Sequence, residues 1–404
     1  MNNSNMPRRA AKVLTVAVLA AWAATAGAQS TPPWYVAPQL SVTKDSNVFR
    51  ANTGEITDTI SSLALLGGID IPFGRQAFVA DALVRRDVFR DQNQLDNTSW
   101  RLGARLDWAT VERLSGSVDV TSRRELARND VLGSTGDTAR TTQRVDSGSL
   151  TARLGATSVL AIQGRLGHQN VDYDSDSTQV NYESLDYRQN FASLGLVYRP
   201  SALLTLGVAY RDTKGKYHNA VPEDEYDRQD IDLTATWVPT GISRVIARVS
   251  FTDEVHEVQT QRDESGVTGA VQWDWRPTGK LHFLSDISRD TGSQIAFSQS
   301  VLPTGELLTA TAPDSRLVAS VGVRAFYDLS AKISLNAELR YTDRDFDVQD
   351  DDSTSLFLIG ARWEPTRAIS LGCFLSTQSR SSTSVTREFD ANVVSCFGRF
   401  TLQG

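Results

Sequence analysis

Long segments of this chain alternate between apolar and polar residues, and this alternation most constrains how the chain can fold. In the segment 204–211, leucine, valine or tyrosine occupies every second position, and small or polar residues lie between them. The segments 97–109 and 331–343 repeat this period of two. Because successive side chains of a β-strand point to opposite faces, each segment is predicted to be a strand with two unlike faces. No comparable segment shows the helical spacing of three and four residues.

The alternation predicts 18 strands, connected alternately by very short turns and by longer polar loops. Proline occurs in many of the short turns, where its fixed φ and its missing N–H donor are tolerated. An even number of antiparallel strands can close into a barrel, which removes the exposed edges of the sheet. The expected strands are 34–44, 58–71, 76–88, 97–109, 113–125, 146–156, 159–171, 186–198, 203–214, 228–238, 243–255, 264–275, 280–290, 315–327, 331–343, 354–363, 368–380 and 388–402.

The apolar face of these strands is expected to meet lipid. Strands of about 10–14 residues are long enough to cross a bilayer at the tilt of a barrel. Short turns on one side and long loops on the other are typical of bacterial outer-membrane barrels, and a periplasmic all-β protein is the alternative. Aromatic residues repeatedly stand two positions before a turn, in register with the apolar face, which predicts an interfacial girdle on the periplasmic side. The girdle residues are Trp108, Tyr198, Trp237, Trp275, Tyr327 and Trp363.

Composition alone would indicate an ordinary soluble protein, because mean hydropathy averages the two faces of each strand. The formal net charge of −7 argues against nucleic acid as a partner. Two cysteines cannot form a disulfide scaffold or a four-cysteine zinc site. The four histidines lie on different hairpins without metal-ligand spacing, and motifs such as G-x-S-x-G are absent. The sequence therefore predicts no catalytic residues, no cofactor and no metal, with a barrel hydrolase as a remote alternative.

The segment 1–28 is predicted to be a secretory signal peptide. A basic head without acidic residues precedes an apolar run at 13–24, and a small-x-small motif ends at Ala28. An N-terminal membrane anchor is the alternative, although the apolar run is shorter than the roughly 20 residues that a spanning helix needs. The remaining segment, 29–404, is expected to form a single outer-membrane β-barrel without a plug domain.

The polar face of the strands is then expected to line the lumen. Charged side chains are intolerable against hydrocarbon but are accommodated in a wet channel. They are interpreted either as cross-strand ladders that stiffen the wall or as a selectivity surface for a charged solute. The long loops 127–144 and 291–314 could fold inward as constrictions or remain outer loops. The charged residues expected to line the lumen are Arg101, Arg105, Asp107, Asp119, Arg123, Arg153, Arg165, Asp232, Arg248, Asp274, Arg324, Glu338, Arg340 and Arg362.

Cys373 and Cys396 lie in the last two predicted strands, at equal distances from a loop centred near Ser384. Antiparallel pairing about that loop places the two cysteines opposite each other on the same face. Directly opposed residues come close enough for a bond, and an oxidising periplasm permits it. A disulfide is therefore predicted, with two lipid-facing thiols as the alternative.

Several motifs taken together resemble a known group of proteins. They are the segment 36–50, the run Ile71-Pro72-Phe73-Gly74-Arg75-Gln76, the Trp-x-Pro-Thr turns at Trp237 and Trp275, and the Cys373/Cys396 hairpin. The chain resembles the EpsL-type outer-membrane proteins of exopolysaccharide-biosynthesis operons, a β-barrel porin group, over essentially its whole mature length.

This resemblance implies a non-enzymatic pore that passes polysaccharide across the outer membrane of a Gram-negative bacterium. The implied partners are outer-membrane lipid, the extracellular polysaccharide and a periplasmic polysaccharide-export protein. A general diffusion porin is the alternative function, and conductance in planar bilayers separates the two: a wide, always-open pore favours the porin.

Overall fold

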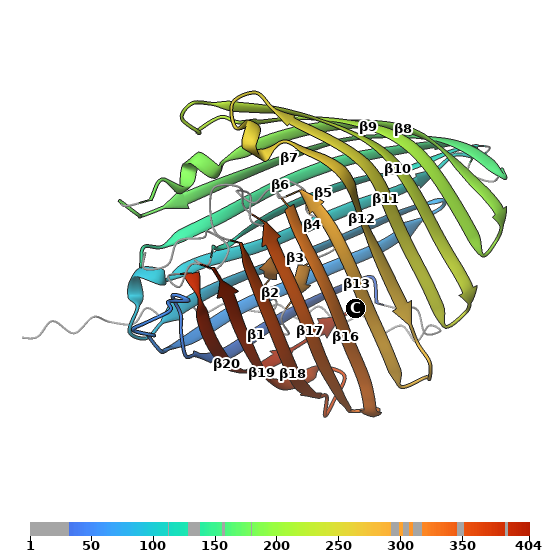
Figure 1. The fold of residues 1–404 in the computed structure, drawn as a ribbon. Helices are drawn as coiled ribbons and strands as arrows, with labels where there is room; N and C mark the ends of the chain where they lie inside the picture. Colours follow the sequence, from blue (N-terminus) through green and yellow to red (C-terminus); the bar gives the residue numbers. More distant parts are fainter. Residues whose placement is uncertain are drawn as a thin grey trace, which may run out of the picture. The chain divides into compact units, whose positions relative to one another are not determined.

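A computed structural model of the chain contains a closed antiparallel β-barrel (Figure 1). It describes residues 32–111, 113–127, 138–155, 158–178, 180–291, 299–301, 307–309, 317–345, 351–383 and 387–404. The predicted signal peptide lies outside these residues, as do large parts of the loops 127–144 and 291–314 that were considered as constrictions.

Eighteen of the described strands are long and form the barrel wall. They are β1 (Trp34–Asp45), β2 (Asp58–Phe73), β3 (Gln76–Phe89), β4 (Asn97–Ala109), β5 (Leu114–Leu126), β6 (Thr141–Leu154), β7 (Leu160–Ser175), β8 (Tyr187–Ser201), β9 (Leu204–Tyr217), β10 (Asp224–Thr240), β11 (Ser243–His256), β12 (Glu264–Trp275), β13 (Leu281–Thr291), β16 (Leu317–Ser330), β17 (Ile333–Asp345), β18 (Asp352–Trp363), β19 (Ile369–Ser382) and β20 (Phe389–Phe400).

The remaining described elements are short. The strands β14 (Gln299–Val301) and β15 (Leu307–Thr309) pair only with each other, whereas β21 (Leu402–Gln403) pairs with β1. The 3-10 helices are η1 (Asn93–Leu95), η2 (Tyr182–Leu185) and η3 (Thr260–Arg262). In the described part of the chain, no helix is long and apolar enough to cross a membrane.

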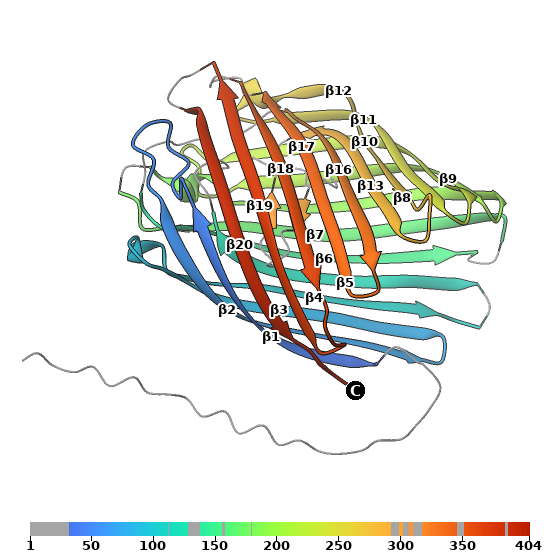
Figure 2. The same cartoon turned by 90° about the horizontal axis from the view of Figure 1, so that it is seen from below.

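Pairing of the first and last long strands closes the barrel. β1 pairs with β2 on one side and with β20 on the other, so the wall has no open edge (Figure 2). The N–H of Gly404 donates to the carbonyl of Trp34, which places the start of the first strand and the C-terminus at the same end of the barrel. The prediction of an 18-stranded antiparallel barrel is confirmed.

Several strands extend further than the alternation predicts, and they do so at the long-loop ends. β6 begins at Thr141 rather than 146, β7 ends at Ser175 rather than 171, and β10 begins at Asp224 rather than 228. Outward positions in these extensions carry charge, as at Asp227 on β10, whose side chain lies 3.1 Å from that of Lys214 on the neighbouring strand. The alternation of apolar residues ends where contact with lipid ends, but the backbone pairing of the strands continues beyond that point.

The outer surface of the barrel is a belt of exposed apolar side chains. Leu40 on β1 and Leu194 on β8 are each 65% exposed. Tyr198, Trp237 and Trp363 are about half exposed near the short turns, on the same outward face. Trp108, Trp275 and Tyr327 occupy outward positions of the same kind. Because an aqueous solvent would strongly disfavour so continuous an apolar belt, this surface is one that a bilayer covers.

A cross-strand disulfide joins the last two strands of the wall. Cys373 on β19 and Cys396 on β20 are register partners with Cα atoms 4.0 Å apart, and the structure bonds them. Both side chains point outward, in the same alternation as Leu371 and Leu375.

Removal of this disulfide is expected to destabilise the closing hairpin. The bond links residues separated by 23 positions, and a loop of that order corresponds to about 3 kcal/mol of unfolding free energy. A Cys373→Ser/Cys396→Ser variant should therefore unfold at lower urea concentration, as followed by tryptophan fluorescence in lipid vesicles. Labelling of the unreduced, denatured wild type should find no free thiol, and two thiols per chain would contradict the bond.

Candidate functional site in the barrel lumen

The inward faces of the strands carry the charged residues that the alternation assigns to the lumen. Register pairing places them opposite one another, as for Arg105 and Asp119 on β4 and β5, and for Arg324 and Glu338 on β16 and β17. The structure places the following on inward positions: Arg101, Arg105, Asp107, Asp119, Arg123, Arg153, Arg165, Asp232, Arg248, Asp274, Arg324, Glu338, Arg340 and Arg362.

A cavity of about 850 Å³ lies against the inner wall formed by β4 to β13. This volume exceeds that of a single water molecule many times over, and both polar and apolar residues line it. The charged and aromatic side chains that line it are Arg105, Asp119, Arg165, His168, Phe191, Arg211, Asp232, Arg248 and Asp290.

Most of the charges around this cavity are paired with each other. Arg105 lies 2.8 Å from Asp107 and 3.3 Å from Asp119. Further along the wall, Arg340 on β17 lies 2.9 Å from Asp286 on β13. Such cross-strand pairs support the interpretation of the lumen charges as a ladder that stiffens the wall.

A fully buried ion-pair network forms the densest part of the ladder. Arg228 on β10 is completely enclosed and lies 2.9 Å from Asp230, 2.9 Å from Asp290 and 3.4 Å from Glu254. Arg248 on β11 reaches Asp290 at 2.5 Å. Hydroxyl groups of neighbouring threonines complete the hydrogen bonds of the guanidinium group. Charge therefore cross-links three strands, β10, β11 and β13, inside the barrel.

Arg165 on β7 differs from these paired arginines. It has no carboxylate within ion-pair distance among the described residues; instead it donates to the Ser149 hydroxyl at 3.4 Å and lies 5.3 Å from the ring centre of Phe191. The nearby Arg153 similarly donates to the Gln163 side chain. Because Arg165 lines the cavity, it presents positive charge to whatever occupies that space.

A cluster of tyrosines fills the long-loop half of the lumen above this cavity. Tyr217 lies 5.4 Å from Tyr187 and 6.0 Å from Tyr226, and Tyr226 stacks on His256 at 5.2 Å. Tyr173 and Tyr182 belong to the same buried cluster, whose tyrosines come from β7 to β10 and η2. We call these five tyrosines the tyrosine cluster.

Hydrogen bonds connect the tyrosine cluster to the cavity. The Tyr226 hydroxyl donates to Gln189 at 2.8 Å, Gln189 donates to Gln169 at 3.0 Å, and Gln169 donates to the Tyr187 hydroxyl at 3.2 Å. Both glutamines line the cavity. The tyrosine cluster therefore lies beside the cavity, on the side of the long loops.

One carboxylate beneath the loops is strongly perturbed. Asp186, which follows η2, is 5% exposed and accepts hydrogen bonds from the Tyr173 N–H at 2.6 Å and from the Asn219 amide at 2.8 Å. Burial raises the pKa of Asp186 to about 6, because the charged form loses its hydration, and these two hydrogen bonds oppose that rise.

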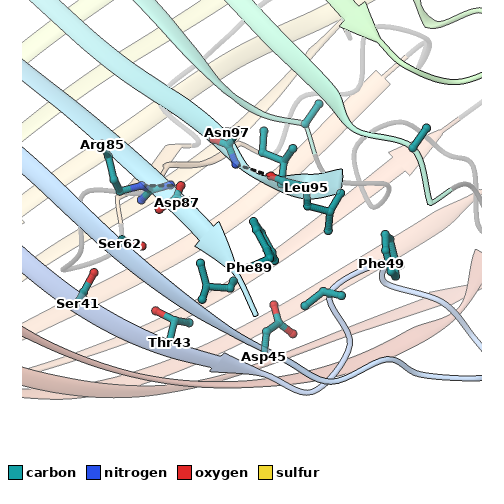
Figure 3. Close-up of a pocket in the computed structure, with 15 residues that line it drawn as sticks. Ser41, Thr43, Asp45, Phe49, Ser62, Arg85, Asp87, Phe89, Leu95 and Asn97 are labelled. Carbon is teal, nitrogen blue, oxygen red and sulfur yellow. Dashed lines mark hydrogen bonds and ion pairs between the residues drawn. The ribbon is translucent and has the colours of Figure 1, made fainter. Parts of the chain in front are cut away.

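A smaller cavity of about 60 Å³ lies against β1 to β5 (Figure 3). Arg85 donates to Asp87 at 3.0 Å, and the Asn97 amide donates to the carbonyl of Leu95. Phe49 and Phe89 pack with Leu95 as an apolar cluster beside these polar groups. Its small volume suits a few water molecules rather than an organic solute.

Aromatic rings lie flat against glycines of neighbouring strands instead of projecting into the lumen. The ring of Phe191 covers Gly167, the ring of Phe397 covers Gly372, and a Cβ on either glycine would collide with the ring. Both pairs are also register partners. This arrangement packs the wall while leaving the space beside Arg165 open.

Substitution of Gly167 by alanine is expected to push the Phe191 ring into the cavity. The ring would leave the wall and Arg165, which should lower the conductance of a reconstituted barrel and cost about 1–3 kcal/mol of stability. Gly164→Ala on the same strand is the matched control, because its nearest neighbouring atom is 3.9 Å from the added Cβ. Equal single-channel conductance of the two variants would contradict the expectation.

A protein-family model matches the C-terminal part of the chain. The family model described as Putative beta-barrel porin 2 matches residues 304–399. No curated protein matches the chain significantly. The family match agrees with the porin-group part of the sequence resemblance, whereas the link to exopolysaccharide operons stays a prediction.

Solved porin structures are similar over most of their length. OccK2 (OpdF) of Pseudomonas aeruginosa is 13% identical, with 93% of this chain and 100% of that chain covered and a TM-score of 0.47. A BenF-like porin from Pseudomonas fluorescens Pf-5 is 13% identical, with 91% and 99% covered and a TM-score of 0.45. OccK5 (OpdH) of P. aeruginosa is 12% identical, with 91% and 98% covered and a TM-score of 0.45.

Proposed function

We propose that the protein is a diffusion pore for small hydrophilic solutes in the outer membrane of a Gram-negative bacterium. The observation that carries this proposal is the cavity of about 850 Å³ inside a closed barrel whose outer face is apolar. Polar walls lower the free energy of water and solutes inside the lumen, and the outer belt holds the barrel in lipid. The proposal assigns transport, and no catalysis, to the chain.

The distribution of charge supports a pore that is narrow and weakly selective for anions. Paired arginines and carboxylates cancel much of each other's field, whereas Arg165 and Arg153 have neutral hydrogen-bond partners. The tyrosine cluster narrows the path on the long-loop side. A small anion therefore meets compensating positive charge along its path, and a large polymer meets packed side chains.

Planar-bilayer recording of the purified mature chain tests this proposal. The expected result is stepwise conductance, with a reversal potential in a salt gradient that indicates anion preference. Arg165→Ala should reduce that preference. The double variant Arg105→Ala/Asp107→Ala removes an arginine together with a carboxylate that pairs with it, leaves the net charge of the lumen unchanged, and serves as the matched control. Folded barrels that insert into the bilayer but never conduct would overturn the proposal.

A second proposed function is polysaccharide export, for which the sequence resemblance is the main support. Arginine–phenylalanine pairs beside cavities, Arg165 with Phe191 and Arg399 with Phe397, are surfaces on which a sugar ring and its acidic substituents could bind. The proposed partners are outer-membrane lipid, an extracellular polysaccharide and a periplasmic polysaccharide-export protein. A deletion strain with unchanged secreted polysaccharide would contradict export while leaving the diffusion pore intact.

A further inference from the structure

Three side chains with metal-binding chemistry converge outside the lumen, at the long-loop end of the barrel. Asp172 lies near the end of β7, Asp186 follows η2, and His218 lies in the turn between β9 and β10. One potential ligand atom from each residue lies within 4.8 Å of the others. Atoms that bind one ion at bond lengths near 2 Å are separated by about 3–4 Å, so the three ligand atoms must move somewhat closer together to bind it.

The charges of this group are not compensated by protein cations. Neither Asp172 nor Asp186 has a lysine or arginine within ion-pair distance among the described residues. The adjacent Arg144 is instead engaged with Asp146 at 2.8 Å. Two neighbouring carboxylates, one of them buried, are unfavourable unless a positive charge lies between them.

The imidazole of His218 supplies an independent observation. Its Nδ1 atom is shielded from solvent and has no hydrogen-bond partner within the described ranges. An enclosed nitrogen of this kind is costly in the absence of a partner, and a metal ion provides one through the nitrogen lone pair.

Amide side chains hold both carboxylates in orientation. The Asn170 amide donates to Asp172 Oδ2 at 2.5 Å, and the Asn219 amide donates to Asp186 Oδ2 at 2.8 Å. The Tyr173 N–H donates to the other oxygen of Asp186. Hydrogen bonds from surrounding residues commonly orient the ligands of metal sites in this way.

We propose that Asp172, Asp186 and His218 bind one divalent transition-metal ion of the zinc class. Two carboxylate oxygens and one imidazole nitrogen suit Zn²⁺ better than Ca²⁺ or Mg²⁺, which prefer oxygen ligands alone. The ion would connect three segments that are distant in sequence and hold the connections of two neighbouring hairpins together. It would thereby stabilise the tyrosine cluster, to which Tyr173 contributes from the same strand as Asp172.

Calorimetric titration with Zn²⁺ tests the site on the full mature chain, folded in detergent, free of affinity tags and stripped with a chelator. We expect one ion per chain and a higher thermal midpoint with the ion bound. His218→Ala should abolish this binding, and Asn219→Ala should weaken it by about 10–100-fold through loss of carboxylate orientation. Heat-modifiable gel mobility would verify that each variant remains folded.

His282→Ala is the matched control, because His282 lies 3.0 Å from a single carboxylate, Asp274, in the lumen. This variant should bind Zn²⁺ as the wild type does. The proposal is overturned if the folded wild type binds no Zn²⁺, if folded His218→Ala binds it equally well, or if millimolar Ca²⁺ displaces it. None of these results bears on conductance, so the test is separate from that of the pore.

Discussion

Replacement of Arg228 by alanine is expected to lower the free energy of unfolding by about 3–5 kcal/mol. The guanidinium group contacts Asp230, Glu254 and Asp290, and it is completely enclosed. Its removal leaves several buried carboxylates with too few cations, so they must either remain charged at low dielectric or take up protons. The loss of stability arises because buried carboxylates are left without a cation. It therefore exceeds the loss expected from removing one ion pair on the surface.

Urea unfolding in lipid vesicles, followed by tryptophan fluorescence, measures this loss. Arg105→Ala is the matched control, because Arg105 also faces the lumen and pairs with two carboxylates, but its side chain is 54% exposed. Solvent screens the charges around Arg105, so its replacement should lower the free energy of unfolding by at most about 1 kcal/mol. Similar unfolding midpoints for the two variants would contradict a distinct role for the buried network.

The barrel itself was predictable from the sequence because lipid imposes a simple rule on every strand. Outward positions must be apolar, and inward positions can be polar, so a period of two marks each crossing. The cysteine pairing followed from the same regularity, since antiparallel register is set by distance from the turn. The rule holds only where lipid is present, which is why β6, β7 and β10 extend beyond their predicted ends.

The interior contacts were less predictable, because they join strands that are far apart in sequence. Arg228 lies on β10, on the same face as the predicted lumen residue Asp232. Asp290 lies on β13, with two strands in between, and only the register of β10 to β13 brings Arg228 and Asp290 together. Arg211 was also missed, although its position in the alternation of β9 indicates an inward side chain. Both Arg211 and Arg228 could have been found by following the alternation of inward and outward positions beyond the apolar part of each strand.

The tyrosine cluster was missed for a related reason. Its members lie mostly in segments interpreted as loops, since the outward residues beside them are polar. Tyr226 occupies an inward position in the alternation of β10, and Tyr173 occupies an inward position in that of β7. Metal-ligand spacing likewise fails as a signal for Asp172, Asp186 and His218, because they lie far apart in sequence, two in the hairpin of β7 and β8 and one in the turn between β9 and β10.

Tyr226→Ala is expected to raise the single-channel conductance and to lower stability by about 3–5 kcal/mol, the range for truncating a buried aromatic side chain. The ring stacks on His256 at 5.2 Å and covers Gly215, and the hydroxyl group holds Gln189 at the boundary of the cavity. Loss of the ring removes the packing that closes this side of the lumen, and loss of the hydroxyl releases the glutamine. Water and ions should then reach the cavity through the gap.

Tyr226→Phe separates the two contributions. Phenylalanine keeps the ring but loses the hydrogen bond to Gln189, which should cost about 1 kcal/mol and leave the conductance close to that of the wild type. Bilayer recordings of both variants, at equal ionic strength, make the comparison. If folded Tyr226→Ala conducts as the wild type does, the tyrosine cluster does not limit flow, and the constriction must be formed by other parts of the barrel.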